Sequence, residues 1–368
     1  MQTKNADHRL APLDAMRGMA ALAVIVYHVR HFGGDLHTYP LASATVPWFL
    51  YLRGWMFVDF FFVLSGVVLT YRYLEPISNS ELDAREFFVL RLSRLYPLHL
   101  LTLLFCAAVQ WTCLALNRPE IIYNRSDLYH LFLNLAYLHS GGFEDVFTYN
   151  GPSWSVAVEV IAYLAFFLFA SKKRTTYIAA SLCTVVASVA VIRMSLTFPI
   201  LNFEVGRGLI GFFVGSLLFL AMRHFKSTGQ MRKVAWSGFV AMLVLFGVTF
   251  AVGYQNFIGD STLPLLLVIF PLVILSGLEI DALAWVLSLR PLTFLGDLSY
   301  AIYLVHVPVQ MVIIGLLRER HRDVPVTSGL FLAQFFAAVL VVAFCVHKLF
   351  ELPARRWVRR RFHSLGAG

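Results

Sequence analysis

Ten apolar stretches along the chain are each long enough to cross a lipid bilayer. A helix needs about 20 mostly apolar residues to span the hydrocarbon core. The stretches are residues 11–31, 48–71, 93–116, 152–171, 176–196, 205–222, 234–253, 262–280, 294–317 and 327–350. A shorter apolar run at 128–139 is expected to be re-entrant or interfacial. The sequence therefore predicts an all-α fold, a polytopic transmembrane bundle of about ten helices.

The composition agrees with a membrane protein that has little mass outside the bilayer. Hydrophobic residues make up 59% of the 368 residues and charged residues 14%, whereas soluble domains carry about 25% charged residues. Asp14 and Arg17 occupy the place where the apolar part of a cleavable signal peptide would begin, so a permanent first span is expected. We expect one domain over 1–368, with a core at about 11–350 and a basic cytoplasmic tail at 351–368.

The net charge of +9 is distributed as expected for a multi-pass membrane protein. With both termini cytoplasmic, most of the 30 Lys and Arg residues fall in inner segments, as the positive-inside bias requires. The basic residues are scattered over short loops, which argues against a nucleic-acid partner. The sequence thus predicts a multi-pass protein of the cytoplasmic (inner) membrane, surrounded by lipid.

The cysteines give no sign of a metal site or a disulfide framework. All four lie inside apolar stretches, and no pair has the spacing of metal ligands. They are Cys106, Cys113, Cys183 and Cys345. No metal and no bound cofactor are therefore expected.

The first stretch carries two ionisable side chains on one helical face. Arg17 and His28 are eleven residues apart, almost three turns, or about 16 Å along a helix axis. Asp14 precedes Arg17 by three residues and can pair with its guanidinium. Charges in apolar spans commonly mark function, and a neutral imidazole can act as a base or nucleophile. The alternative is a packing histidine beside a snorkelling arginine.

Glu159 is the main candidate to act together with His28. Ser155 and Glu159 share one face of the fourth stretch, and the expected topology places Glu159 and His28 at similar depth below the outer surface. A carboxylate beside an imidazole can fix its tautomer and stabilise imidazolium. The alternative is a structural pair, for example with Arg207, which could also pair locally with Glu204. Asp59 could orient the histidine or pair with an intramembrane cation.

Arginines near the inner surface could bind an anion. Arg91 and Arg94 are three residues apart in a segment that suits an amphipathic interfacial helix before Pro97, and together they could hold a phosphorylated ligand. Membrane anchoring is the alternative for each. The basic run ELPARRWVRRRF at 351–362 is expected to anchor the chain at the inner leaflet rather than to bind a ligand.

The ninth stretch contains a second candidate histidine. Ser299, Tyr303 and His306 fall on one helical face. Tyr303 could relay protons, and His306 competes with His28 for the catalytic role.

Five short segments occur in a fixed order: LDAMRGMAALAVIVYH, FFFVLSG, RLSRLYP, PSWSVAVE and FLGDLSYAIYLVH. Together they resemble the acyltransferase-3 family of integral membrane acyltransferases. Each segment is weakly specific alone, but the ordered set is specific. The resemblance runs from about residue 11 to 350, although 175–290 adds only hydrophobic spans.

The resemblance implies transfer of an acyl group, usually acetyl, from cytoplasmic acyl-CoA to a hydroxyl of a carbohydrate-type acceptor such as O-antigen, exopolysaccharide or a glycoside. The implied partners are acyl-CoA as co-substrate, a carbohydrate or glycolipid acceptor, and the bilayer. It makes Arg17 and His28 the central pair, Glu159 a third catalytic residue, and Arg91 and Arg94 donor-binding residues. The expected supporting residues are Asp14, Asp59, Ser155, Tyr303 and His306. No extra soluble domain is expected, as in the stand-alone members.

Three alternatives stay open at the level of sequence. A transporter or flippase could use intramembrane Arg, His and Glu as a substrate or proton path, although no internal repeat is visible. Another type of multi-spanning O-acyltransferase could work from a late histidine such as His306. A structural or sensory membrane protein is the third. The residues also leave open whether His28 is a general base or a covalent acyl carrier.

Overall fold

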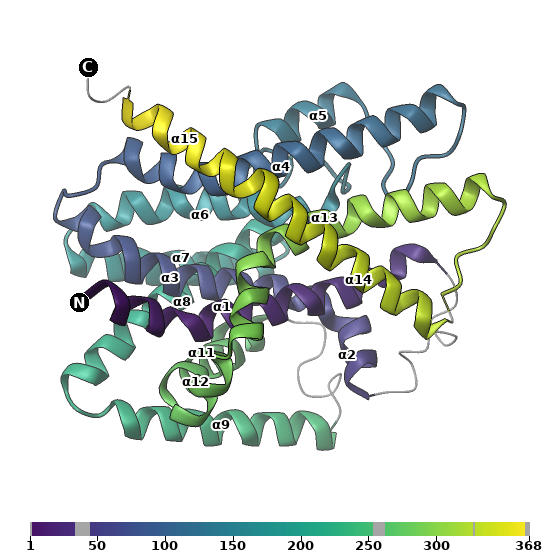
Figure 1. Cartoon of the computed structure of the whole chain (residues 1–368). Helices are drawn as coiled ribbons and strands as arrows, with labels where there is room; N and C mark the ends of the chain where they lie inside the picture. Colours follow the sequence, from purple (N-terminus) through teal and green to yellow (C-terminus); the bar gives the residue numbers. More distant parts are fainter. Residues whose placement is uncertain (1, 34–44, 253–261, 327, 365–368) are drawn as a thin grey trace. The chain divides into compact units, whose positions relative to one another are not determined.

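The structure, a computed structural model, describes residues 2–33, 45–252, 262–326 and 328–364. These residues form helices and turns without a β-strand (Figure 1). Eight described helices are long and apolar enough to cross a membrane, or nine if a bent pair, Leu265–Glu279 with Asp281–Leu287, is one span. The predicted all-α fold with several membrane-spanning helices is confirmed. The count of ten and the side on which the termini lie stay predictions.

The predicted apolar stretches correspond to helices in the same order. The elements are α1 (Gln2–His28), η1 (Val29–Phe32), α2 (Thr45–Arg53), η4 (Gly54–Met56), α3 (Phe57–Ser78), α4 (Ala84–Ala115), α5 (Leu128–Leu135), η5 (Gly151–Ser153), α6 (Trp154–Ala170), α7 (Arg174–Arg193), α8 (Phe203–Ser227), α9 (Met231–Val252), η6 (Leu265–Ile269), α11 (Phe270–Glu279), α12 (Asp281–Leu287), α13 (Arg290–Glu319), α14 (Gly329–Val346), η7 (His347–Glu351) and α15 (Leu352–Ser364). α1 is not among the eight apolar helices, since Asp14, Arg17 and His28 lower its hydropathy. Residues 365–368 of the predicted tail lie outside the described residues.

The stretch predicted to span at 262–280 is not a straight helix. It begins with the π-helical turn η6, continues as α11, and then bends by 90° into α12. Pro264 and Pro271 explain the irregular start, because a proline donates no backbone hydrogen bond and its ring crowds the preceding turn.

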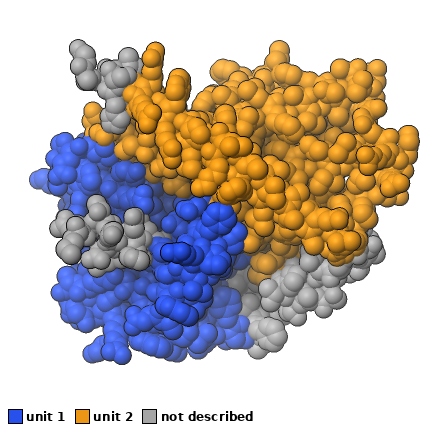
Figure 2. Space-filling view, in the orientation of Figure 1, with its two compact units in different colours: residues 1–20, 56–82, 158–297 blue, residues 21–55, 83–157, 298–368 orange. Residues whose placement is uncertain are grey.

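The described residues divide into two compact units (Figure 2). Unit 1 comprises residues 1–20, 56–82 and 158–297, and unit 2 comprises residues 21–55, 83–157 and 298–368. α1, α6 and α13 each contribute residues to both units. The prediction of a single family domain over 1–368 stays a prediction.

Close contact between α3 and α8 forms the centre of unit 1. A Cβ atom added at Gly66 would lie 1.9 Å from the carbonyl oxygen of Phe212, and one added at Gly215 would lie 2.0 Å from that of Val63. Only glycine permits backbones to approach so closely. Gly66 and Gly215 therefore serve close packing of the two helices.

Alanine at Gly66 is expected to destabilise unit 1 by about 1–3 kcal/mol, because the methyl group would force α3 and α8 apart. The measurement is the thermal unfolding of detergent-purified protein. Gly247→Ala on α9 is the matched control, since nothing lies within 4 Å of a Cβ added there. Equal stability of the two variants would contradict the close packing of α3 on α8.

Unit 2 contains α4, α5, α15 and the larger part of α13. α4 continues through Pro97 as one helix, whereas the sequence predicted an interfacial helix before the proline and a separate span at 93–116. Gln110, fully buried on α4, holds the following loop by donating to the carbonyl oxygens of Ile121 (2.9 Å) and Tyr123 (2.6 Å). α15 packs against α4 (Figure 1).

Candidate active site

His28, the last residue of α1, lies in unit 2, and a hydrogen bond to its own helix holds one of its ring nitrogens. Its Nδ1 is 2.9 Å from the carbonyl oxygen of Val24. Because a carbonyl oxygen only accepts hydrogen bonds, Nδ1 must be the donor, and Nε2 of the neutral ring then carries the lone pair. The residue is partly exposed. The local helix thus holds His28 in the tautomer that can act as a base or nucleophile through Nε2.

Three histidines cluster around this position in unit 2. The ring centroid of His28 lies 4.8 Å from that of His306 and 5.0 Å from that of His31. The amide of Gln310 joins them, since its Nε2 donates to the His28 carbonyl oxygen (2.8 Å) and its Oε1 accepts from His31 Nδ1 (3.1 Å). The described residues include no group of three or more His, Cys, Asp or Glu side chains that could hold a metal ion.

The sequence missed His31 and Gln310, although their spacing contained a signal. His31 follows His28 by three residues, and Gln310 follows His306 by four, so each shares a helical face with a predicted site residue. His306 is fully buried, and neither of its ring nitrogens has a hydrogen-bond partner among the described residues. His28 and His306, which the sequence treated as competitors, are therefore direct neighbours.

Ser155 and Tyr303 extend the same cluster. The Tyr303 hydroxyl donates to the carbonyl oxygen of Pro152 (2.7 Å) and lies 2.8 Å from Ser155 Oγ. The Tyr303 and His306 rings are 6.0 Å apart. The structure therefore brings together His28, Ser155, Tyr303 and His306, all of them predicted site residues of unit 2.

Arg17 lies on α1 within unit 1, and its predicted partner is confirmed. Its Nη1 is 3.8 Å from Asp14 Oδ1, and the two side chains are 20% and 39% exposed. α1 passes very close to the start of α13 here, because a Cβ added at Gly18 would lie 2.7 Å from the backbone nitrogen of Gly296. Asp14 and Arg17 thus form a local pair on a tightly packed helix.

The two intramembrane acids of unit 1 have different partners. Glu159 accepts hydrogen bonds from the hydroxyls of Ser65 (2.6 Å) and Tyr163 (2.5 Å). Asp59, which is fully buried, pairs through Oδ1 with Arg207 Nε (3.0 Å) and Nη2 (2.9 Å). This confirms the prediction that Asp59 pairs with an intramembrane cation. The predicted pairing of Glu159 with His28 concerns residues of different units and stays a prediction.

Arg91 and Arg94 lie on α4 in unit 2. Arg91 is 4% exposed and Arg94 is partly exposed. Arg91 is thus more deeply buried than expected of a side chain that only anchors a helix at the interface. Their donor-binding role stays a prediction.

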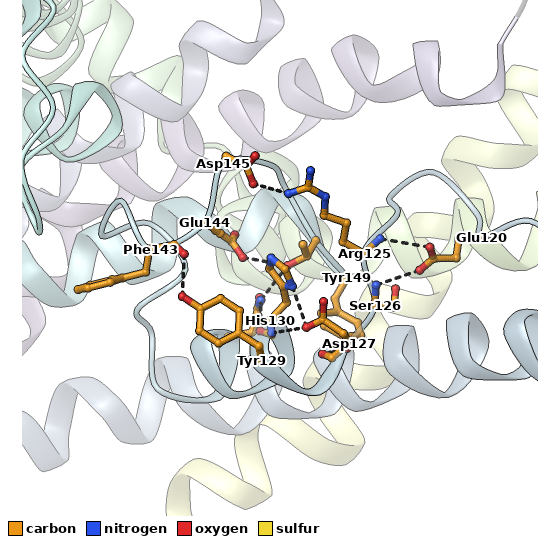
Figure 3. Close-up of polar contacts among 12 residues, drawn as sticks. Glu120, Arg125, Ser126, Asp127, Tyr129, His130, Phe143, Glu144, Asp145 and Tyr149 are labelled. Carbon is orange, nitrogen blue, oxygen red and sulfur yellow. Dashed lines mark hydrogen bonds and ion pairs between the residues drawn. The ribbon is translucent and has the colours of Figure 1, made fainter.

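The loop around α5 contains a polar cluster that the sequence did not indicate (Figure 3). Asp127 caps α5 by accepting from the backbone nitrogen of His130 (2.9 Å) and from its Nδ1 (2.8 Å). These bonds lower the pKa of Asp127. Thr148 Oγ1 accepts from Asn134 Nδ2 (3.0 Å) and donates to Glu144 Oε2 (3.3 Å). The cluster fastens the loop to the short helix.

Burial raises the pKa of Glu144 from 4.5 to about 8. The folded loop therefore binds the carboxyl proton more tightly than the unfolded chain does. The contribution of Glu144 to stability should therefore be fully present below about pH 4.5 and should decline as the pH rises to about 8. Glu144→Gln should abolish this decline, measured as the unfolding temperature between pH 5 and 8, whereas Glu81→Gln at an exposed site should preserve it. A decline that persists in Glu144→Gln would contradict the assignment.

Comparison with known proteins covers nearly the whole chain. The family model Acyl_transf_3, described as an acyltransferase domain, matches residues 10–348. The chain is 27% identical over 344 residues to "Putative peptidoglycan O-acetyltransferase YrhL" of Bacillus subtilis, covering 84% of this chain and 50% of that protein. It is 24% identical over 332 residues to "O-acetyltransferase OatA" of Staphylococcus aureus, covering 82% and 50%. No solved structure matches.

The relatives differ in how much of their length is shared. The chain spans about half the length of YrhL and OatA. It is also 25% identical over 383 residues to "Acyltransferase MdmB" of Streptomyces mycarofaciens, covering 96% of this chain and 93% of that protein. The ordered motifs, the apolar helices and the family match over residues 10–348 agree. The chain is a multi-pass membrane protein that belongs to the acyltransferase-3 family.

Proposed function

We propose that the protein is a membrane O-acyltransferase of the cytoplasmic membrane that moves an acetyl group from cytoplasmic acetyl-CoA to a hydroxyl of a carbohydrate-type acceptor. The family match and the names of YrhL and OatA support an O-acetyl transfer. The observation that carries the proposal is the His28 imidazole, whose Nδ1 is held by Val24 and whose Nε2 keeps its lone pair.

His28 can serve this reaction in two ways. As a general base, Nε2 removes the proton of the acceptor hydroxyl while the hydroxyl oxygen attacks the thioester carbonyl carbon. The C–S bond then breaks, and the proton passes from His28 to the CoA thiolate. As an acyl carrier, Nε2 attacks the carbonyl carbon, CoA leaves as thiolate, and the acceptor oxygen displaces the imidazole. The hydroxyl proton again ends on the CoA thiol, so both routes give an ester and free CoA.

The other predicted residues have supporting roles in this scheme. Arg17 steers the donor or polarises its carbonyl group. Glu159 orients the imidazole, a role for which it is better suited than Asp59, because Asp59 is already paired with Arg207. Arg91 and Arg94 bind the donor phosphates.

Thioester cleavage by purified protein tests the proposal. Wild-type protein incubated with labelled acetyl-CoA and sugar acceptors is expected to release free CoA thiol and labelled ester. A transporter would leave the donor intact, so an unconsumed donor across a panel of acceptors would refute the enzyme. Mass spectrometry of cell-surface glycans from strains with and without the gene would identify the acceptor.

A further inference from the structure

The C-terminal helix α15 contributes two arginines to the surface of α4 that carries Arg91 and Arg94. Arg359 donates from Nε to Ser93 Oγ and from Nη2 to the Leu90 carbonyl oxygen, each at 3.3 Å. Arg355 precedes it by one helical turn on the same face. The basic tail, which the sequence favoured as a lipid anchor, is therefore packed against α4.

Around Arg355, guanidinium groups outnumber carboxylates among the described residues. Arg355 lies close enough to Arg91, Arg94 and Arg359 to be repelled by their charges, and within the described part of the chain the carboxylate that attracts it is Glu351. Glu351 Oε2 already accepts a hydrogen bond from His347 Nδ1 (2.9 Å). Like charges gathered at a partly buried site are costly unless an anion compensates them.

Arg355 also keeps a donor that the described residues do not satisfy. Its Nε is buried and has no hydrogen-bond partner among them. Guanidinium groups bind phosphate through paired N–H donors, so such a cluster suits a ligand that bears several phosphates. Coenzyme A carries a diphosphate and a separate phosphate on its ribose.

We propose that Arg355 and Arg359 of α15 complete, with Arg91 and Arg94, the site that binds the phosphate groups of the acyl-CoA donor. This inference rests on the proposed function. It adds a second helix to the donor site, one that follows the last apolar span, and it gives the basic face of α15 a role in donor affinity.

Equilibrium binding of CoA to detergent-purified full-length protein tests the site directly. Arg355→Gln is expected to weaken CoA binding by about tenfold or more. Pantetheine, which lacks the phosphates, should bind wild type and variant alike. Arg356→Gln is the matched control. Arg356 is the next residue of the same helix and is exposed, and its replacement removes the same charge. It should bind CoA as wild type does.

Anionic lipid headgroups share this chemistry, so binding to vesicles with and without phosphatidylglycerol forms a second arm. If Arg355→Gln binds CoA normally, the proposal is overturned; weaker vesicle binding in that variant would then assign the cluster to lipid.

If wild type binds CoA through Arg355 but cleaves no thioester, the proposed function fails and this inference stands. If wild type cleaves acetyl-CoA and Arg355→Gln has an unchanged KM, this inference alone fails.

Discussion

Replacement of His28 by alanine is expected to lower the rate of acetyl transfer by about a hundred- to ten-thousand-fold, the usual loss when a general base is removed. The reason is geometric: Nδ1 donates its hydrogen bond to the Val24 carbonyl oxygen, so Nε2 carries the reactive lone pair. Alanine has no group that could replace it. The measurement is the release of CoA thiol by purified protein. Membrane insertion and thermal unfolding should remain as in wild type, because His28 is partly exposed.

Two other histidine variants make this result interpretable. His224→Ala, at an exposed site on α8, should retain full activity. His306→Ala removes a buried ring 4.8 Å from His28, so activity should fall less than in His28→Ala, through altered packing. A larger loss of activity in His306→Ala than in His28→Ala would make His306 the catalytic histidine. Wild-type activity in His28→Ala would refute the assignment of His28. Labelled acetyl-histidine trapped after exposure to donor alone would identify the carrier route.

Asp59→Leu is expected to destabilise unit 1 by about 3–5 kcal/mol, the usual cost of breaking a buried ion pair. Asp59 is fully buried and Arg207 is 6% exposed, so the variant would leave a guanidinium charge in an apolar site without its carboxylate. The measurement is the thermal or chemical unfolding of purified protein, together with the yield of inserted protein.

The chain provides its own control for this prediction. Glu75 on α3 and Arg223 on α8 form an exposed ion pair between the same two helices, and such pairs contribute only about 0–1 kcal/mol. Glu75→Ala should therefore change stability little. The double variant Asp59→Leu/Arg207→Leu should recover much of the loss, since it removes both charges. Similar effects of Asp59→Leu and Glu75→Ala would contradict the importance of burial.

The sequence by itself determined the features that depend on neighbours along the chain. Apolar runs of spanning length predicted the helices, because the bilayer fixes how many apolar residues a span needs. The Asp14–Arg17 pair was predictable because residues three apart share a helical face. The ordered motifs predicted the family. Local spacing also contained the signals for His31 and Gln310, each of which shares a helical face with a predicted site residue.

The tertiary structure alone decided which distant side chains meet. Asp59 and Arg207 are separated by 148 residues, Ser155 and Tyr303 also by 148, and Ser93 and Arg359 by 266. Helical periodicity gives the face on which each side chain lies but not the helix that packs against it. That choice depends on close contacts such as the one between Gly66 of α3 and the backbone of α8, and on the packing of α15 against α4. For this reason the sequence could mark His28 only as a candidate, whereas the structure showed that His306 lies beside it and that the arginines of α15 pack on α4.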